Sequence, residues 1–434
     1  MHSPPRALLA SLIVLALAAC SPTAERERGH VRESPKAQPS KGNQPVASSG
    51  TALVVAWPGE VAAIDPASGS ILFDGPGVLP ATNSSTVVTA EAEDELTFVR
   101  TIRVATGEVV RTARVAGELA VRVVSGDGLH VALMDPTAQG TDPWTPTPRT
   151  TTDIVVADTR GSVAPRRYHL DGNFDPEAFS QDGGSLFMIK YLPAEAPTAY
   201  RVVQLELEDG DVYPVLGRRK SWSQRMAGTR LAQAAAPDGT GLYTLYTSQP
   251  APYASGFDAQ QANADRAVAF VHSLSLSRDF AVCVGLPKPL WGADPEQEAI
   301  AAAPDGGRVY VVDAALGMVV VMDTWKTKVV RTGRVPLTSM GDGRTAAAVT
   351  PNGSTLFVAR GGEIAEIDTS TLRLRDMRTT DVDVSAMGFS PDGTTIWLGS
   401  ADGAAAMDVR TWTPGATIEA PNSGAPMFVR PIAA

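Results

Sequence analysis

The sequence contains few of the residues that build disulfide scaffolds and metal centres. Its 434 residues include two cysteines and five histidines, and aromatic residues make up 6% of the chain. The patterns His-x-His, HExxH, CxxC, Gly-x-Ser-x-Gly and the P-loop are all missing, which removes the usual motifs for zinc binding, a nucleophilic serine and phosphate binding. We therefore expect a fold held together by hydrophobic packing, with no metal and no cofactor.

Basic charge is also scarce. The net charge is −10, and residues 1–50 contain six Lys or Arg and three Asp or Glu, so residues 51–434 carry a net charge of −13. Nucleic acids and anionic membrane surfaces both attract basic proteins. The acidic balance therefore argues against nucleic acid as a partner, and against a domain that itself lies on a membrane.

The first 20 residues have the layout of an export signal. A short charged start precedes an apolar run over residues 7–19, which is too short to cross a bilayer core, where about 20 residues are needed. The sequence Leu17-Ala18-Ala19-Cys20 resembles the lipobox of bacterial lipoproteins. This resemblance implies cleavage of residues 1–19, lipidation of Cys20 and an extracytoplasmic protein anchored to the cell membrane. An ordinary secretory signal with an incidental cysteine is the alternative.

Residues 20–50 are predicted to be a disordered tether behind the lipidated cysteine. Residues 21–50 are rich in Ser, Pro, Gly, Gln and charge, with two valines and no aromatic residue, so they cannot bury enough apolar surface to fold. The folded domain then spans residues 51–434. It keeps a single cysteine, Cys283, within an apolar stretch, and we expect this side chain to be a small buried hydrophobe.

Six related tetrapeptides precede valine-rich runs in this domain. Each predicts a tight hairpin turn, because Pro, Asp or Asn, and Gly favour the required backbone angles. Calcium binding by the aspartates is the less favoured interpretation, since each Asp stands alone and calcium loops need several oxygen ligands close together. The six are Ser125-Gly-Asp-Gly128, Ser180-Gln-Asp-Gly183, Ala236-Pro-Asp-Gly239, Ala303-Pro-Asp-Gly306, Thr350-Pro-Asn-Gly353 and Ser390-Pro-Asp-Gly393.

The tetrapeptides belong to a longer repeat of four short strands. Residues 299–335 contain the turn, two valine-rich strands, the pair Asp323-Thr324 and a fourth strand, and residues 345–378 and 384–419 follow the same plan. A four-strand repeat of about 40 to 50 residues is typical of β-propellers. The motif order resembles YVTN-type and WD-like propeller repeats, which implies an all-β propeller scaffold. Related propellers include lactonases and quinoprotein subunits.

Counting the third strands gives eight blades, with seven as the alternative. The third strands are expected at residues 61–65, 101–104, 154–158, 202–205, 271–274, 319–323, 364–368 and 404–408. The first unit begins at Thr51 with a second-strand sequence, and residues 425–431 resemble the inner strand of the last blade. We therefore expect the C-terminal strand to close the ring as the inner strand of blade one, which removes an open sheet edge.

The strand topology predicts two different faces. With strands A to D running outward and alternating in direction, the A–B and C–D turns share one face, here named the turn face. The B–C loops and D–A crossovers share the other, here named the insertion face. The long insertions all belong to the insertion face, where we expect binding. They are B–C loops at 135–152, 191–199 and 248–267, and crossovers at 217–229 and 287–298.

The candidate ligand-binding residues are aromatic and basic side chains of these insertions. Aromatic residues anchor interfaces, and a basic cluster could steer an acidic partner. The alternative is that the aromatic residues only pack their own loops. The candidates are Trp222, Trp291, Tyr253 and Phe257, together with Arg218, Arg219 and Lys220; Trp144 and Tyr191 lie in the same insertions.

Two functions remain open from the sequence. The favoured one is a non-catalytic, monomeric scaffold that binds a protein, a peptide or an envelope glycan. The alternative is an extracytoplasmic enzyme of lactonase-like or quinoprotein-like type with its site at the mouth of the central channel. His130, His169 and His272 all lie in strand-like sequence without metal-ligand spacing, and no catalytic residue is predicted.

Overall fold

A computed structural model describes residues 51–57, 60–77, 85–138, 147–216, 225–249, 268–278, 280–291, 294–338, 340–419 and 428–433. The predicted signal peptide, Cys20 and tether lie outside these residues. In the described part of the chain, no helix is long and apolar enough to span a membrane. The folded unit is almost entirely β-structure, interrupted by the short 3-10 helices η1 (Pro136–Ala138), η3 (Lys288–Leu290) and η4 (Pro295–Gln297).

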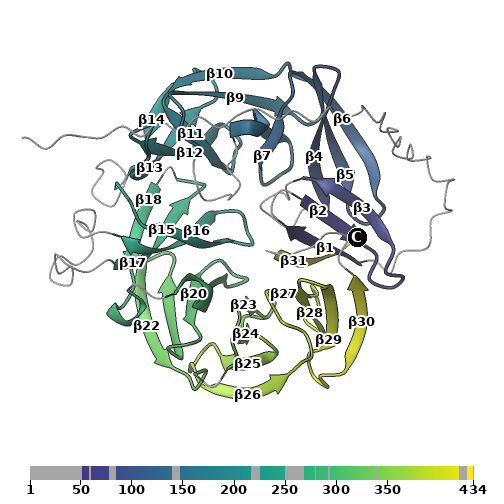
Figure 1. Cartoon of the computed structure of the whole chain (residues 1–434), viewed down its shortest axis with the longest axis vertical. Helices are drawn as coiled ribbons and strands as arrows, with labels where there is room; N and C mark the ends of the chain where they lie inside the picture. Colours follow the sequence, from purple (N-terminus) through teal and green to yellow (C-terminus); the bar gives the residue numbers. More distant parts are fainter. Residues whose placement is uncertain are drawn as a thin grey trace, which may run out of the picture. The chain divides into compact units, whose positions relative to one another are not determined.

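The strands form eight antiparallel sheets that surround a common axis, which confirms the eight-bladed propeller (Figure 1). Blade 1 contains β31 (Phe428–Ala433), β1 (Thr51–Trp57), β2 (Glu60–Ile64) and β3 (Ile71–Pro76). Blade 2 contains β4 (Thr86–Glu93), β5 (Leu96–Arg103) and β6 (Glu108–Ala116). Blade 3 contains β7 (Ala120–Val124), β8 (His130–Met134), β9 (Thr151–Asp158) and β10 (Arg166–Asp171). Blade 4 contains β11 (Asn173–Phe179), β12 (Ser185–Leu192), β13 (Ala199–Glu206) and β14 (Val212–Pro214).

The second half of the ring is more regular. Blade 5 contains β15 (Thr229–Ala235), β16 (Gly241–Gln249), β17 (Val268–Ser275) and β18 (Phe280–Gly285). Blade 6 contains β19 (Glu298–Ala302), β20 (Arg308–Asp313), β21 (Met318–Asp323) and β22 (Lys328–Arg334). Blade 7 contains β23 (Thr345–Val349), β24 (Thr355–Arg360), β25 (Glu363–Asp368) and β26 (Leu374–Thr379). Blade 8 contains β27 (Ala386–Phe389), β28 (Thr395–Ser400), β29 (Gly403–Asp408) and β30 (Pro414–Glu419).

Seven of the eight predicted third strands occupy the third position of their four-stranded sheets, and the eighth, at residues 101–104, belongs to β5, the middle strand of the three-stranded sheet of blade 2. In blade 2 the described strands are the second, third and fourth strands of a blade (B, C and D). The evidence is a hydrogen bond at the end of the third strand, where the N–H of Val104 donates to the carbonyl oxygen of Ser85. The N–H of Thr369 makes the equivalent bond to Ser354 in blade 7. The residues that precede β4, 78–84, lie outside the described residues.

The hydrophobic core is divided among the boundaries between neighbouring blades. In β20, Val309 and Val311 join the cluster shared with blade 5, whereas Tyr310 and Val312 join the cluster shared with blade 7. Successive side chains of a strand point to opposite faces of the sheet, and here both faces are covered. This double burial explains why the repeats are continuous valine-rich runs rather than alternating patterns.

The C-terminal strand closes the ring as predicted. β31 pairs antiparallel with β1 from Thr51–Ala433 to Ala56–Phe428, and β31 also contacts the inner strand β27 of blade 8. A Cβ atom at Gly388 would lie 2.0 Å from the carbonyl oxygen of Val429, so glycine is required for this close approach. The first and last strands of the domain thus share one sheet.

Repeated hydrogen bonds hold the turn face together. In each of the six tetrapeptides the Gly N–H donates to the carbonyl oxygen three residues earlier at 2.8–3.0 Å, with the glycine φ between 65° and 72°. The Asp or Asn Oδ1 accepts the N–H two residues later at 2.9–3.0 Å. These bonds confirm the predicted turns and use the side-chain oxygens within the turn itself.

The Asp-Thr pair after the third strand joins two turns of one blade. The Asp carboxylate accepts a main-chain N–H of the C–D turn, as Asp323 does from Lys326 at 2.8 Å. The following Thr hydroxyl donates to the glycine carbonyl of the A–B turn, as Thr324 does to Gly306 at 2.7 Å. Thr159 and Thr369 make the same bond in blades 3 and 7. The repeat signature is therefore explained by turn chemistry.

Candidate functional site on the insertion face

The long insertions leave the strands where the topology predicts, but most of the predicted binding residues lie outside the described residues. These are Trp222, Arg218, Arg219, Lys220, Tyr253 and Phe257, and also Trp144. Their role in binding stays a prediction. The described inner part of the insertion face consists of the first residues of the A strands and the last residues of the B strands.

Two of the aromatic residues are described, and both are packed. The indole N–H of Trp291 donates to the carbonyl oxygen of Leu286 at 2.8 Å, and its ring packs against the core between blades 5 and 6. Tyr191 is part of β12 and is buried among the aromatic residues of blades 4 and 5. Both residues thus pack within the protein, which was the alternative interpretation of the aromatic residues in the insertions. Contact of Trp291 with a partner stays a prediction.

Ion pairs connect the inner strands of blades 3, 4 and 5. Arg122 of β7 forms an ion pair with Asp175 of β11, in which its Nη2 atom donates to the two carboxylate oxygens at 2.6 Å and 2.7 Å. Glu177 of β11 contacts Arg230 of β15 at 2.7 Å and 2.9 Å, and accepts a bond from Gln233 at 2.6 Å. These bidentate pairs fix the orientation of the strands around this part of the channel.

The burial of Arg230 is compensated by its partner. Burial alone would lower the pKa of Arg230, but the Glu177 carboxylate outweighs this effect and raises it above the usual value. The neighbouring His272 is 5% exposed, and burial together with Arg230 lowers its pKa to about 4. Burial also raises the pKa of Cys283, and the buried position of its side chain is as predicted. These groups are structural parts of the blades.

A different arrangement occurs at the insertion-face end of blade 6. Glu298, the first residue of β19, and Asp313, the last residue of β20, are opposite one another in the antiparallel register. Their residues are 3% and 0% exposed. Both Glu298 carboxylate oxygens and Oδ2 of Asp313 have no hydrogen-bond partner in the protein. Burial and, second, the charge of Asp313 raise the pKa of Glu298 to about 8, and burial also raises that of Asp313.

Other buried polar atoms without partners lie at the same level of the ring. They are Oδ1 of Asn173 at the start of β11, Oγ1 of Thr247 near the end of β16, and Oγ1 of Thr345 at the start of β23. A buried polar group that lacks a hydrogen bond costs about 1–3 kcal/mol, so such groups are rare and require an explanation. In the described residues most of them gather where the inner strands meet the insertion face; Oγ1 of Thr101, in the third strand of blade 2, is an exception.

The two remaining histidines of the described domain have different surroundings. His169 is exposed and lies 2.7 Å from Asp153, which raises its pKa. His130 contacts the ring of Phe179 with the centroids 6.1 Å apart. In the described ranges no three His, Cys, Asp or Glu side chains come together as a metal site.

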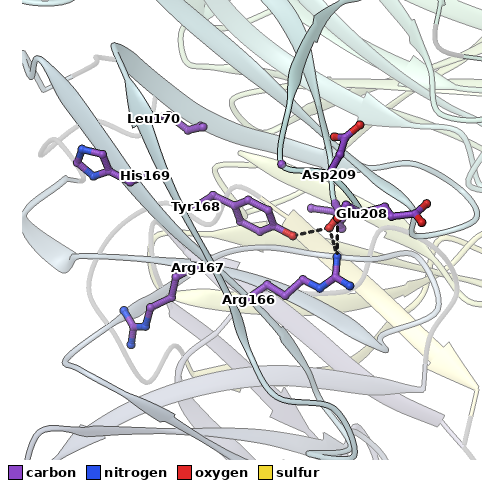
Figure 2. A pocket seen from close by; sticks show the side chains of 9 residues that line it. Arg166, Arg167, Tyr168, His169, Leu170, Glu208 and Asp209 are labelled. Carbon is purple, nitrogen blue, oxygen red and sulfur yellow. Dashed lines mark hydrogen bonds between the residues drawn. The ribbon is translucent and has the colours of Figure 1, made fainter.

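A polar groove lies elsewhere, on the outer strand of blade 3. It has a volume of about 430 Å³ and runs between β10 and the C–D turn of blade 4. Figure 2 shows Tyr168 and Arg166 reaching the same turn, where the Tyr168 hydroxyl donates to the carbonyl oxygen of Leu207 at 2.8 Å. These bonds join blade 3 to blade 4, and the groove is remote in the fold from the unpartnered carboxyl groups.

The comparisons with known proteins identify the fold alone. No protein-family model and no curated protein matches the sequence. The chain is similar to apo AztD from Citrobacter koseri with a TM-score of 0.51 at 10% identity, over 88% of this chain and 98% of AztD. It is similar to the dihydro-heme d1 dehydrogenase NirN in complex with DHE with a TM-score of 0.51 at 14% identity, over 90% of this chain and 77% of NirN.

A third solved structure is more distant. The periplasmic gluconolactonase PpgL from Pseudomonas aeruginosa has a TM-score of 0.43 at 16% identity, over 88% of this chain and 99% of PpgL. Of the two structures with a TM-score of 0.51 described above, one is a dehydrogenase by name. At these identities the shared propeller carries no activity over to this chain.

Sequence reasoning missed Glu298, Asp313 and the ion pairs of blades 3 to 5. A signal for Glu298 was present, because it is an acidic residue directly before the apolar inner-strand sequence Ala299-Ile300. In blades 7 and 8 the corresponding first residues are Thr345 and Ala386. The pairing with Asp313 depends on strand register, which the sequence pattern does not fix to one residue.

Proposed function

We propose that this protein is a lipid-anchored, extracytoplasmic propeller that binds a protein, a peptide or an envelope glycan at its insertion face, without catalysing a reaction. The observation that carries the proposal is the contrast between the two faces. Turn-face polar groups bind one another within and between the turns, whereas the long B–C loops and crossovers leave the strands at the insertion face. Loops that a rigid scaffold positions in this way are common binding sites.

Binding is favoured over catalysis by the state of the acidic groups. Asp175 and Glu177 are engaged by arginines, and Glu298 and Asp313 are buried. A general acid or base must come within hydrogen-bond reach of its substrate, and none of these four carboxyl groups is both free and accessible. Partner recognition by the surrounding loops has no such requirement.

The anchor is tested by replacing Cys20 with serine in the full chain. We expect Cys20→Ser to move the protein from the membrane fraction to the soluble fraction, or to leave the precursor uncleaved, because the thiol that receives the lipid is gone. Fractionation and the mass of the mature N-terminus measure this. Normal processing with unchanged membrane retention would contradict lipidation.

The binding face is tested by capture from envelope extracts. The proposal predicts that Trp222→Ala combined with Arg218→Ala, Arg219→Ala and Lys220→Ala abolishes capture of the partner and leaves the melting temperature unchanged. Asp305→Ala is the matched control on the turn face, where it removes only an acceptor within one turn. Loss of capture in the Asp305 variant and retention in the Trp222 variant would place binding on the opposite face.

A further inference from the structure

Glu298, Asp313 and Thr247 lie at one boundary between two blades. Ile300 and Val311 belong to the core cluster shared with blade 5, and so does Leu245 of β16. Side chains two residues apart on a strand point to the same side. Glu298 is two residues from Ile300, Asp313 is two residues from Val311, and Thr247 is two residues from Leu245. All three side chains therefore face the boundary between blades 5 and 6, at its insertion-face end.

The three side chains retain oxygen atoms that nothing in the protein engages. Oδ1 of Asp313 accepts the main-chain N–H of Leu316 at 2.8 Å, which leaves its Oδ2 without a partner. The two carboxylate oxygens of Glu298 and the hydroxyl oxygen of Thr247 are also without partners, and Thr247 is 1% exposed. Four oxygen atoms from two blades thus lie without partners at the insertion-face end of this boundary.

The charge at this position is only partly balanced. The main-chain N–H of Leu316 binds Asp313, and the charge of Arg360 in blade 7 acts on the same carboxyl group. Neither Glu298 nor Asp313 forms an ion pair with the described residues. Two buried carboxyl groups with oxygens that lack both hydrogen bonds and a cation are costly. The burial of all three side chains excludes a substrate-sized ligand.

We propose that Glu298, Asp313 and Thr247 bind one divalent cation of the hard, oxygen-preferring class, for which Ca²⁺ is the probe. Ca²⁺ accepts carboxylate and hydroxyl oxygens in flexible geometry, whereas Mg²⁺ demands a near-ideal octahedron and Zn²⁺ prefers His and Cys ligands. Water completes the coordination, because only two carboxylates contribute. The site is independent of the partner-binding function and would join the 287–298 crossover to blade 5.

The test measures melting and metal content of the purified full-length protein in detergent. We expect 1 mM Ca²⁺ to raise the melting temperature by at least about 3 °C over EDTA, with one Ca²⁺ bound per chain by equilibrium dialysis. Glu298→Gln and Asp313→Asn should abolish both effects. Glu296→Gln, which removes the same charge from an exposed position of the same crossover, should preserve both.

Three outcomes would overturn the proposal. One is a melting temperature that is the same in Ca²⁺ and EDTA. Another is a Glu298→Gln variant that binds and responds to Ca²⁺ like the natural chain. The third is an equal response of the natural chain and all variants to Mg²⁺ and Ca²⁺, which is the behaviour of unspecific screening on an acidic protein.

Discussion

Carboxyl groups on the two faces of the propeller have opposite properties. On the turn face, burial alone would raise the pKa of Asp158, but hydrogen bonds from Ser162 and Arg160 outweigh it and lower the pKa to about 2. On the insertion face, burial and the neighbouring Asp313 raise the pKa of Glu298 to about 8. Asp158 is therefore favoured in its charged form and Glu298 in its neutral form. The first carboxyl group stabilises the folded ring, whereas the second costs stability.

The largest expected effect comes from opening the ring, because both faces depend on its closure. Deletion of residues 424–434 takes away β31, the inner strand of blade 1. We expect the melting temperature to fall by more than about 10 °C, or the protein not to fold, because β1 and β27 lose their partner at once. Thermal unfolding measured by circular dichroism tests this. An unchanged melting temperature would show that the closure is dispensable.

The next prediction compares one carboxyl group from each face. Asp158→Asn should cost about 2 kcal/mol at pH 7, because the charged form makes the bonds in the folded state. This stabilisation is present above pH 3.8 and is lost as the pH falls towards 2. In EDTA, Glu298→Gln should leave stability unchanged or raise it, because the folded protein no longer has to bury an acid that takes up a proton.

Urea unfolding of both variants at pH 7 measures this comparison. If Glu298→Gln destabilises the protein as much as Asp158→Asn in EDTA, the two faces do not differ in the way described. The same result would indicate that Glu298 has a partner within the folded chain.

His272 provides a pH test within blade 5. Its pKa of about 4 in the folded protein lies below the usual 6.5, so its neutral form is preferred. The associated stability is complete above pH 6.5 and decreases as the pH falls towards 4, by about 2 kcal/mol at pH 5. We expect the stability difference between the natural chain and His272→Gln to shrink by this amount between pH 7 and pH 5. A difference that is constant with pH would show that the imidazole is not buried in its neutral form.

The smallest expected effects on stability concern two threonine hydroxyl groups, one on each face. Thr324→Val removes the hydroxyl that donates to Gly306 and should cost about 1 kcal/mol. Thr345→Val removes a buried hydroxyl without a partner, on the insertion face, and should be neutral or stabilising. Differential scanning calorimetry of the two variants side by side distinguishes them. Equal losses would contradict the difference between the faces.

The features predicted from the sequence are those with a local chemical cause. The tetrapeptide turns, the Asp-Thr pairs and the blade count follow from short-range backbone preferences, and the structure confirms all of them. The closure by β31 was also predictable, because the sequence from Thr51 is of second-strand type and residues 425–431 resemble an inner strand. By contrast, Glu298 meets Asp313, 15 positions later, through strand register, and Thr247, 51 positions before Glu298, lies at the same boundary because blade 5 packs on blade 6. Neither relation leaves a local pattern in the sequence.

The pairing of β1 with β31 sets the order in which this molecule can be completed. The strand made first waits for the strand made last, so a chain whose final residues are still held in a ribosome or a translocation channel keeps an unpaired edge on β1. The ring therefore closes only after β31 has been released. Until then β1 is exposed to mispairing, and a chaperone that covers this edge would protect the protein at its most vulnerable step.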